Sequence, residues 1–469
     1  MPPWQPSAIF FMRAAACIFV LLACWQVRIF SFSHYFLRYA FFYFAILFLA
    51  CSWVARRWTL REAIRHHAWL FPCLAGLLLL QGCAVWLRAP ELGTEAISAV
   101  LSVSENIAIQ LLYMAVLYQA CRIFMGNKTV YPALLWGAGC AFVIICCACA
   151  LQAASLGFAG FTHPWAQFIA SQSTILTKAL YPWLEGRWVN GVYDMYHQGT
   201  YALTCYRING IYGEASALAV NVATFFIPLG FGLSFLAGKA KMYGGIIVSL
   251  SLLILAGTIS LTGLALFVTG TIVFVGGFFW QRQTRRFRLC FLLLLTPVVA
   301  ALLFSTQLRV QFKTHSSGSS PRLVVTLDTL DLIREYPWLG VGRNNFSHFI
   351  VKQKRYVEAT DRDPELSAWK KSKNVPTLSD LPGFAAEFGI PVTLFCFAVL
   401  LGLWRKLYRM RQSGEDKEFH TAVLAAYSAW LVMAFVAGFG IVGLRNPMFC
   451  LPFFVAAAVA SGGFGKQKA

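Results

Sequence analysis

Two charged residues stand at the start of a long apolar run. In RINGIYGEASALA (207–219), Arg207 and Glu214 flank Gly210 and Gly213. An arginine guanidinium stays protonated and can hold two phosphate oxygens in its planar fork, and a carboxylate inside an apolar span is a functional hypothesis by default. We interpret Arg207 as a phosphate ligand and Glu214 as its orienting partner or a general base. The alternative is an arginine that anchors a helix end at the membrane surface, with Glu214 only paired to it.

A second group of cations lies in a hydrophilic stretch further along the chain. Such a concentration of positive charge suits an anionic ligand such as a lipid diphosphate, although a solvated loop or contact with anionic headgroups remains the alternative. Arg322 and Arg343, which flank a predicted helix, are the two strongest candidates. The full group is Arg309, Lys313, Arg322, Arg334, Arg343, Lys352, Lys354 and Arg355.

Histidines are candidates for a general base, because the unperturbed imidazole pKa is about 6.5. Of those in the predicted outer loops, His348, close after GRNNFS, is the strongest candidate. The sequence lacks a Cys/His cluster with metal spacing and lacks nucleotide-binding motifs. We therefore expect no metal or other cofactor.

The composition predicts an all-α polytopic membrane protein that forms one integral domain over 1–469. The chain is 58% hydrophobic and only 12% charged, with a mean hydropathy of +0.63, whereas soluble domains carry about 25% charged residues. We ascribe the net charge of +20 to loops and expect no nucleic-acid partner. Most of the 14 cysteines lie in apolar runs, which favours small buried side chains over a disulfide framework.

Apolar runs of about 20 residues are long enough to cross a bilayer as helices, and about twelve are predicted. The stretch 242–280 is predicted to split into two spans near 258–260. The predicted spans are 8–24, 36–55, 68–87, 97–121, 129–157, 211–236, 242–258, 260–280, 288–306, 384–404, 420–439 and 446–462.

Lys and Arg collect in alternate short loops, which places both termini in the cytoplasm. Two long loops, 158–210 and 307–383, then lie on the periplasmic side, and each is expected to contain a short amphipathic helix. In RLVVTLDTLDLIRE (322–335), the apolar positions 323, 327, 330 and 333 recur at helical spacing, which predicts a helix lying on the membrane surface. PWLGVGRNN then ends it with Pro and Gly.

Three segments, in this order, resemble motifs of the O-antigen ligase and polysaccharide polymerase superfamily. RINGIYGEASALA (207–219) is similar to its Arg-x-x-Gly entry to a span. RLVVTLDTLDLIREYPWLGVGRNNF (322–346) is similar to its Arg, helix and Pro-x-x-Gly-x-Gly-x-x-x-Phe pattern. LPGFAAEFGIPVTLFCF (381–397) is similar to the segment that re-enters the membrane at a Glu-x-Gly step. The first half of the chain resembles the family only in its topology.

The resemblance implies a glycosyltransferase of the bacterial inner membrane with a GT-C-like architecture and its active site at the periplasmic face. Its donor would be a glycan on undecaprenyl diphosphate, with Arg207 holding the diphosphate, and a chain-length regulator protein is a candidate partner besides the bilayer. Residues implied in catalysis are Arg207, Glu214 and His348. Residues implied in diphosphate or glycan binding are Arg207, Arg322, Arg343, Asn345, Asp380, Glu387 and Arg445.

Two departures from the ligase pattern favour a polymerase. Leu378 stands where ligases carry a histidine, about eleven residues before the glycine that matches Gly389, and SLTGLALF (260–267) lacks the ligases' arginine. Arg322, Arg343 or Arg445 would then supply the missing cation. A ligase or oligosaccharyltransferase of the same superfamily is the first alternative. A lipid-glycan flippase is the second, although we find neither the internal repeat nor the paired broken helices typical of transporters.

Overall fold

The structure is a computed structural model of the whole chain, and the placement of part of the chain is described. The described residues are 6–25, 40–54, 70–92, 96–127, 129–157, 188–189, 192–193, 208, 210–212, 215–258, 260–276, 321–361, 364–372, 375, 377, 379–413, 416–438 and 447–463.

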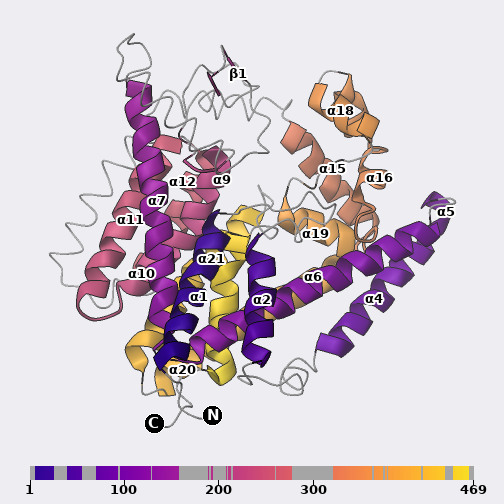
Figure 1. The fold of residues 1–469 in the computed structure, drawn as a ribbon. Helices are drawn as coiled ribbons and strands as arrows, with labels where there is room; N and C mark the ends of the chain where they lie inside the picture. The colour runs from indigo at the N-terminus through magenta and orange to yellow at the C-terminus, as the bar shows by residue number, and fades with distance from the viewer. Residues whose placement is uncertain are drawn as a thin grey trace.

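Helices make up nearly all of the described chain, as predicted (Figure 1). One two-residue hairpin, β1 (Trp188–Val189) and β2 (Val192–Tyr193), is antiparallel. The helices before it are α1 (Pro6–Trp25), α2 (Ala40–Val54), α4 (Leu70–Leu87), α5 (Ala89–Leu92), α6 (Ala96–Met125) and α7 (Tyr131–Gly157). Those after it are α9 (Ala215–Asn221), the π-helix η3 (Val222–Phe226), α10 (Ile227–Leu233), α11 (Lys239–Thr258), α12 (Leu261–Phe274), α15 (Pro321–Glu335), α16 (Phe346–Ile350), α17 (Lys354–Thr360), α18 (Pro364–Ser372), α19 (Asp380–Phe388), α20 (Ile390–Ser413), α21 (Lys417–Gly438), α22 (Pro447–Ala458) and the π-helix η5 (Val459–Gly463).

Seven helical segments of the described chain are long and apolar enough to cross a membrane, and shorter apolar helices accompany them. Together, the seven segments and the four shorter helices coincide with every predicted span except 288–306. That span lies outside the described residues, so the count of twelve stays a prediction. The GT-C-like architecture also stays a prediction. The split of 242–280 is confirmed. Helix α11 ends at Thr258, and the Ser260 hydroxyl caps α12 by accepting a hydrogen bond from the Gly263 amide at 3.3 Å.

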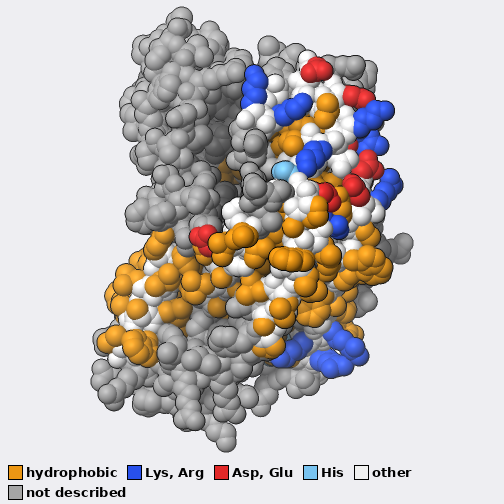
Figure 2. Space-filling model, turned by 90° about the vertical axis from the view of Figure 1, so that its right-hand side faces the viewer, with side chains coloured by type: hydrophobic (Ala, Val, Ile, Leu, Met, Phe, Trp, Pro, Cys, Tyr) orange, Lys and Arg blue, Asp and Glu red, His pale blue; other side chains and the backbone are white. Residues whose placement is uncertain are grey.

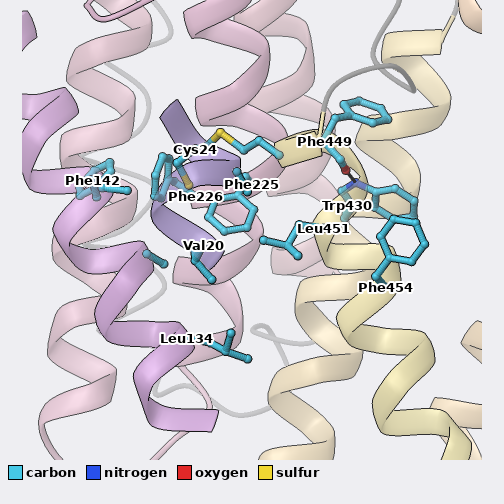
Figure 3. Close-up of a cluster of buried hydrophobic side chains, with 14 of the residues drawn as sticks. Val20, Cys24, Leu134, Phe142, Phe225, Phe226, Trp430, Phe449, Leu451 and Phe454 are labelled. Carbon is cyan, nitrogen blue, oxygen red and sulfur yellow. Dashed lines mark hydrogen bonds between the residues drawn. The ribbon is translucent and has the colours of Figure 1, made fainter. Parts of the chain in front are cut away.

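The membrane helices pack around a core of aromatic and branched side chains. Figure 3 shows side chains from α1, α7, α22 and the π-helix η3 converging in this core. Small residues let some helices approach closely, as expected inside a bilayer. A Cβ atom added at Gly137 of α7 would lie 2.5 Å from the Cys17 carbonyl of α1, so α1 and α7 lie in direct contact.

Helices α15 to α18 form a cap, defined as residues 321–372, at the end of the molecule opposite both termini (Figure 1). In Figure 2, an apolar band crosses the molecule, with mixed charges on one side of it and Lys and Arg side chains on the other. The cap shares a second apolar core with α4 and α6, in which Val85 and Ile107 join Val325, Leu332 and Phe349. The apolar band and the apolar helices are typical of a membrane protein.

Helix α15 confirms the predicted helix over 322–335, but its buried face differs from the predicted apolar stripe. Leu323, Leu327 and Leu330 remain 37–39% exposed. The buried side chains include Val325, Asp328 and Leu332, which face the contacts of α15 with α17 and α19. The reason is that Asp328 is satisfied by partners in the cap, which lets a polar residue occupy the buried face. Contact of α15 with the membrane surface stays a prediction.

Candidate functional site

The turn that follows α15 is bound to the break between α19 and α20. The Val341 amide donates to the Ala386 carbonyl at 2.8 Å, and the Gly342 amide donates to the Glu387 carbonyl at 3.0 Å. In return, the Ile390 amide donates to the Pro337 carbonyl at 2.8 Å. The second and third motif segments of the sequence therefore form one backbone-paired unit.

Two motif glycines make this pairing possible. Gly340 and Gly389 have φ values of +68° and +83°, which L side chains rarely adopt. A Cβ atom at Gly340 would lie 2.5 Å from the Ala386 carbonyl oxygen, and one at Gly389 would collide with the Trp338 carbonyl. The Gly-x-Gly and Glu-x-Gly patterns therefore place glycine where the two backbone segments meet.

Glu387 lies at the centre of this unit. Its side chain is 4% exposed and forms an ion pair with Arg343, whose side chain is 15% exposed. The Asn344 amide also donates to Oε1 of Glu387 at 3.2 Å, from a residue with φ +67°. The carboxylate therefore occupies the position in this turn where an anion would bind.

Arg343 and Glu387 were both predicted to contact substrate, and the structure brings them together as partners of each other. In the described part of the chain, Nε of Arg343 is buried and has no hydrogen-bond partner. The Nε–H group is therefore a buried donor that the pair with Glu387 leaves unsatisfied. Substrate contact by either residue stays a prediction.

Gln81, in the membrane helix α4, is a residue of this site that the sequence interpretation missed. It is buried, its Oε1 accepts from the Arg343 amide at 2.8 Å, and its Nε2 donates to the Glu387 carbonyl at 3.5 Å. The available signal was a lone glutamine inside the apolar helix Leu70–Leu87, since polar residues in membrane helices usually have a specific partner.

His348 lies at the edge of the cap, beside the corner between α4 and α5. Its Nε2 lies 3.0 Å from the Glu91 carbonyl and 2.8 Å from Nζ of Lys352. The nearby Tyr336 hydroxyl donates to Oε2 of Glu91 at 3.0 Å, and the Arg88 guanidinium lies 4.0 Å from the centre of the Tyr336 ring. Burial, reinforced by Glu335 and Glu91, raises the pKa of Tyr336. A role for His348 as a base stays a prediction.

The other predicted residues are distributed as follows. Asn345 belongs to the same turn, where its Nδ2 donates to the Val341 carbonyl at 3.1 Å. Asp380 opens α19, at the opposite end of that helix from Glu387. Arg322 lies in the first turn of α15, and its side chain is outside the described residues. Three further residues lie outside the described residues altogether: Arg207, Glu214 and Arg445.

The described residues between Arg207 and Glu214 are anchored to three membrane helices. The Ile208 amide donates to the Gly257 carbonyl of α11 at 3.0 Å. The Tyr212 hydroxyl donates to the Cys24 carbonyl of α1 at 2.9 Å and lies 3.4 Å from the Met448 sulfur of α22. The π-helix η3 follows in the same span, a distortion that is frequent at functional sites.

The described residues contain no group of three or more His, Cys, Asp or Glu side chains that could hold a metal ion. The candidate site is therefore built from an arginine, carboxylates, amides and backbone groups. Such a set is suited to binding anions and hydroxyl groups.

A match to a known protein family covers the second and third motif segments. Residues 246–397 match the family model described as O-antigen ligase. Members of this family are glycosyltransferase-like enzymes, either ligases or polymerases. The matched segment covers less than half of the chain, includes Arg343 and Glu387, and begins after Arg207 and Glu214. No curated protein matches the chain. The match is consistent with the superfamily that the motifs resemble.

Proposed function

We propose that the protein is a polysaccharide polymerase of the bacterial inner membrane. It would transfer a glycan from undecaprenyl diphosphate onto a second lipid-linked repeat unit at the periplasmic face. The observation that carries the proposal is the family match over 246–397, because it contains the two motif segments that pair at Gly340 and Gly389. The position of both termini opposite the cap supports cytoplasmic termini and a periplasmic cap.

In the proposed reaction, a hydroxyl oxygen of the acceptor glycan attacks the anomeric carbon of the donor. The bond from that carbon to the diphosphate oxygen breaks, and the electron pair leaves with the diphosphate. Arg207 stabilises the negative charge that develops there, since fixed cations aimed at a leaving group lower the barrier. Glu214 accepts the hydroxyl proton, and His348 is the second candidate for this role. No metal takes part in this mechanism.

Arg343 is proposed as a second cation for the diphosphate or the glycan. Its side chain remains 15% exposed while it is paired with Glu387, which leaves it partly accessible to a substrate. Glu387, Asn344 and Gln81 fix its position before a substrate arrives, and a preorganised cation costs little reorganisation when charge develops. Arg322, Asn345, Asp380 and Arg445 complete the proposed set of substrate contacts.

The second candidate function is that of a ligase, and the description of the matched family favours it. Against it stands the sequence itself, because Leu378 occupies the position of the ligase histidine. A ligase transfers a finished chain to a different acceptor, whereas a polymerase elongates lipid-linked repeat units.

The test is chain elongation in proteoliposomes that contain the purified protein and only lipid-linked repeat units of the source pathway. A ladder of products many repeats long is expected. If the donor is consumed only after a different type of acceptor is added, the protein is a ligase instead. Lipid-linked glycan that crosses the bilayer without forming any product would establish a flippase. Adding a chain-length regulator should then narrow the distribution of lengths.

A further inference from the structure

An apolar cavity of about 150 Å³ lies inside the membrane bundle, among α1, α7, α10, α21 and α22. Figure 3 shows four of its lining side chains, Val20, Leu134, Phe225 and Leu451. The cavity lies where α6 ends and α7 begins, which is the end of the bundle opposite the cap (Figure 1). It is therefore separate from the site around Arg343.

The helices around the cavity are irregular at the level of the cavity. Phe225 belongs to the π-helix η3, and Pro228 follows directly in α10. On the other side, Pro452 lies inside α22. Proline removes a backbone hydrogen bond, and a π-turn widens a helix locally. The cavity is therefore bordered by irregular helix geometry on two sides.

The chemistry of the lining excludes polar ligands. It consists of aliphatic and aromatic groups and one methionine. The Tyr427 hydroxyl donates to the Leu400 carbonyl at 3.1 Å, so the ring of this tyrosine serves as an apolar wall. A water molecule needs two to four polar partners, and apolar cavities of about this size stay dry and accept apolar ligands. A sugar or a phosphate would lose its hydration there without replacement.

The cavity is only partly enclosed, so a thin apolar ligand can enter it from its open side. A flexible hydrocarbon chain is thin enough and matches the lining. We propose that the cavity binds an acyl chain of a phospholipid from the leaflet opposite the cap. This binding is independent of the proposed polymerase activity.

The test uses the full-length protein in nanodiscs that contain phosphatidylethanolamine with a diazirine group on one acyl chain. After irradiation, labelled positions are located by mass spectrometry. We expect labelling at cavity residues such as Val423 and Leu229 at least as strong as at Leu394 and Phe395, which are exposed on α20.

Two variants fill the cavity, Val423→Phe and Ala426→Phe, and either should reduce cavity labelling several-fold without changing the label on α20. Ala398→Phe on the exposed face of α20 is the matched control, and gel filtration verifies that each variant is folded. Cavity labelling that stays unchanged in both folded variants would overturn the proposal. So would labelling of the cavity by a diazirine-bearing polyprenyl phosphate but not by the phospholipid, since the occupant would then be an isoprenoid chain.

Discussion

Gln81 of the membrane helix α4 accepts a hydrogen bond from the backbone amide of Arg343 in the cap at 2.8 Å. The same side chain donates to the Glu387 carbonyl at the break before α20. One buried amide group thus connects the apolar helix α4, the cap and the break between α19 and α20.

Replacing Gln81 by Leu should destabilise the protein by about 1–3 kcal/mol, because the partly buried Arg343 amide and the buried Glu387 carbonyl would each lose a partner. Thermal unfolding of the detergent-solubilised protein measures the effect. Gln110→Leu is the matched control, since Gln110 lies in the neighbouring helix α6 and is only partly buried. Equal unfolding temperatures for the two variants would contradict the proposed connection.

Removing one member of the Arg343–Glu387 pair should cost more than removing an exposed ion pair. Arg343→Ala leaves the nearly buried carboxylate of Glu387 without its cation, and such a loss typically costs about 3–5 kcal/mol. Arg334→Ala is the control, because Arg334 is 80% exposed in its pair with Asp331 and should change stability by less than about 1 kcal/mol. Unfolding in denaturant compares the two, and the double variant with Glu387→Gln should recover part of the loss. Additive effects of the two changes would show that the pair is not coupled.

Alanine at Gly389 should disrupt the pairing of the turn with the α19–α20 break. The backbone there has a positive φ, and the added Cβ would collide with the Trp338 carbonyl. We expect faster hydrogen–deuterium exchange of the Val341 and Ile390 amides, which are bonded across this pairing. Gly402→Ala in α20 is the control, since a Cβ there meets no atom within 4 Å. Protected amides in Gly389→Ala would mean that the backbone accommodates the side chain.

Asp328 should make the stability of the cap depend on pH. Burial raises the pKa of its carboxyl group, and this effect exceeds the opposing effects of the Tyr356 amide, which donates to it at 2.7 Å, and of the Arg355 guanidinium. The folded state therefore binds the proton more tightly than the unfolded state does. The contribution is fully present below the unfolded pKa of about 4 and is lost as the pH rises through the folded pKa.

Unfolding temperatures of the wild type and Asp328→Asn, measured from about pH 4 upwards, test this dependence. The wild type should lose stability relative to the variant across that window. Asp361→Asn, at an exposed position, is the control and should follow the wild type. A wild type that gains stability relative to Asp328→Asn as the pH rises would contradict a raised pKa for Asp328.

Arg207 and Glu214 are the residues whose replacement should stop the reaction. Arg207→Ala should abolish chain elongation while the protein still inserts into the membrane, and Arg207→Lys should also lose most activity, because a point charge cannot replace the planar fork. Glu214→Gln keeps the shape and removes the base. Elongation assays with lipid-linked repeat units, with and without EDTA, measure these effects. Near-normal polymer from Arg207→Ala, or strong inhibition by EDTA, would contradict the proposed metal-free diphosphate clamp.

The sequence by itself determined the class of the protein and many of its elements. Hydropathy and periodicity are local properties, so they sufficed to predict a helical membrane protein, the division between α11 and α12, and the helix α15. The positions of Gly340 and Gly389 were also visible as motifs, because positive φ values favour glycine whatever surrounds the residue.

Only the tertiary structure decided which partners these elements meet. Gln81 and Glu387 are 306 positions apart, and no local pattern reveals a contact over such a separation. Arg343 and Glu387 were each predicted to contact the substrate. The structure pairs them with each other, because the turn at 340–345 lies against the end of α19. It also buries Asp328 of α15 and leaves Leu323 and Leu327 partly exposed, since a buried carboxylate is tolerated where the Tyr356 amide and the Arg355 guanidinium satisfy it.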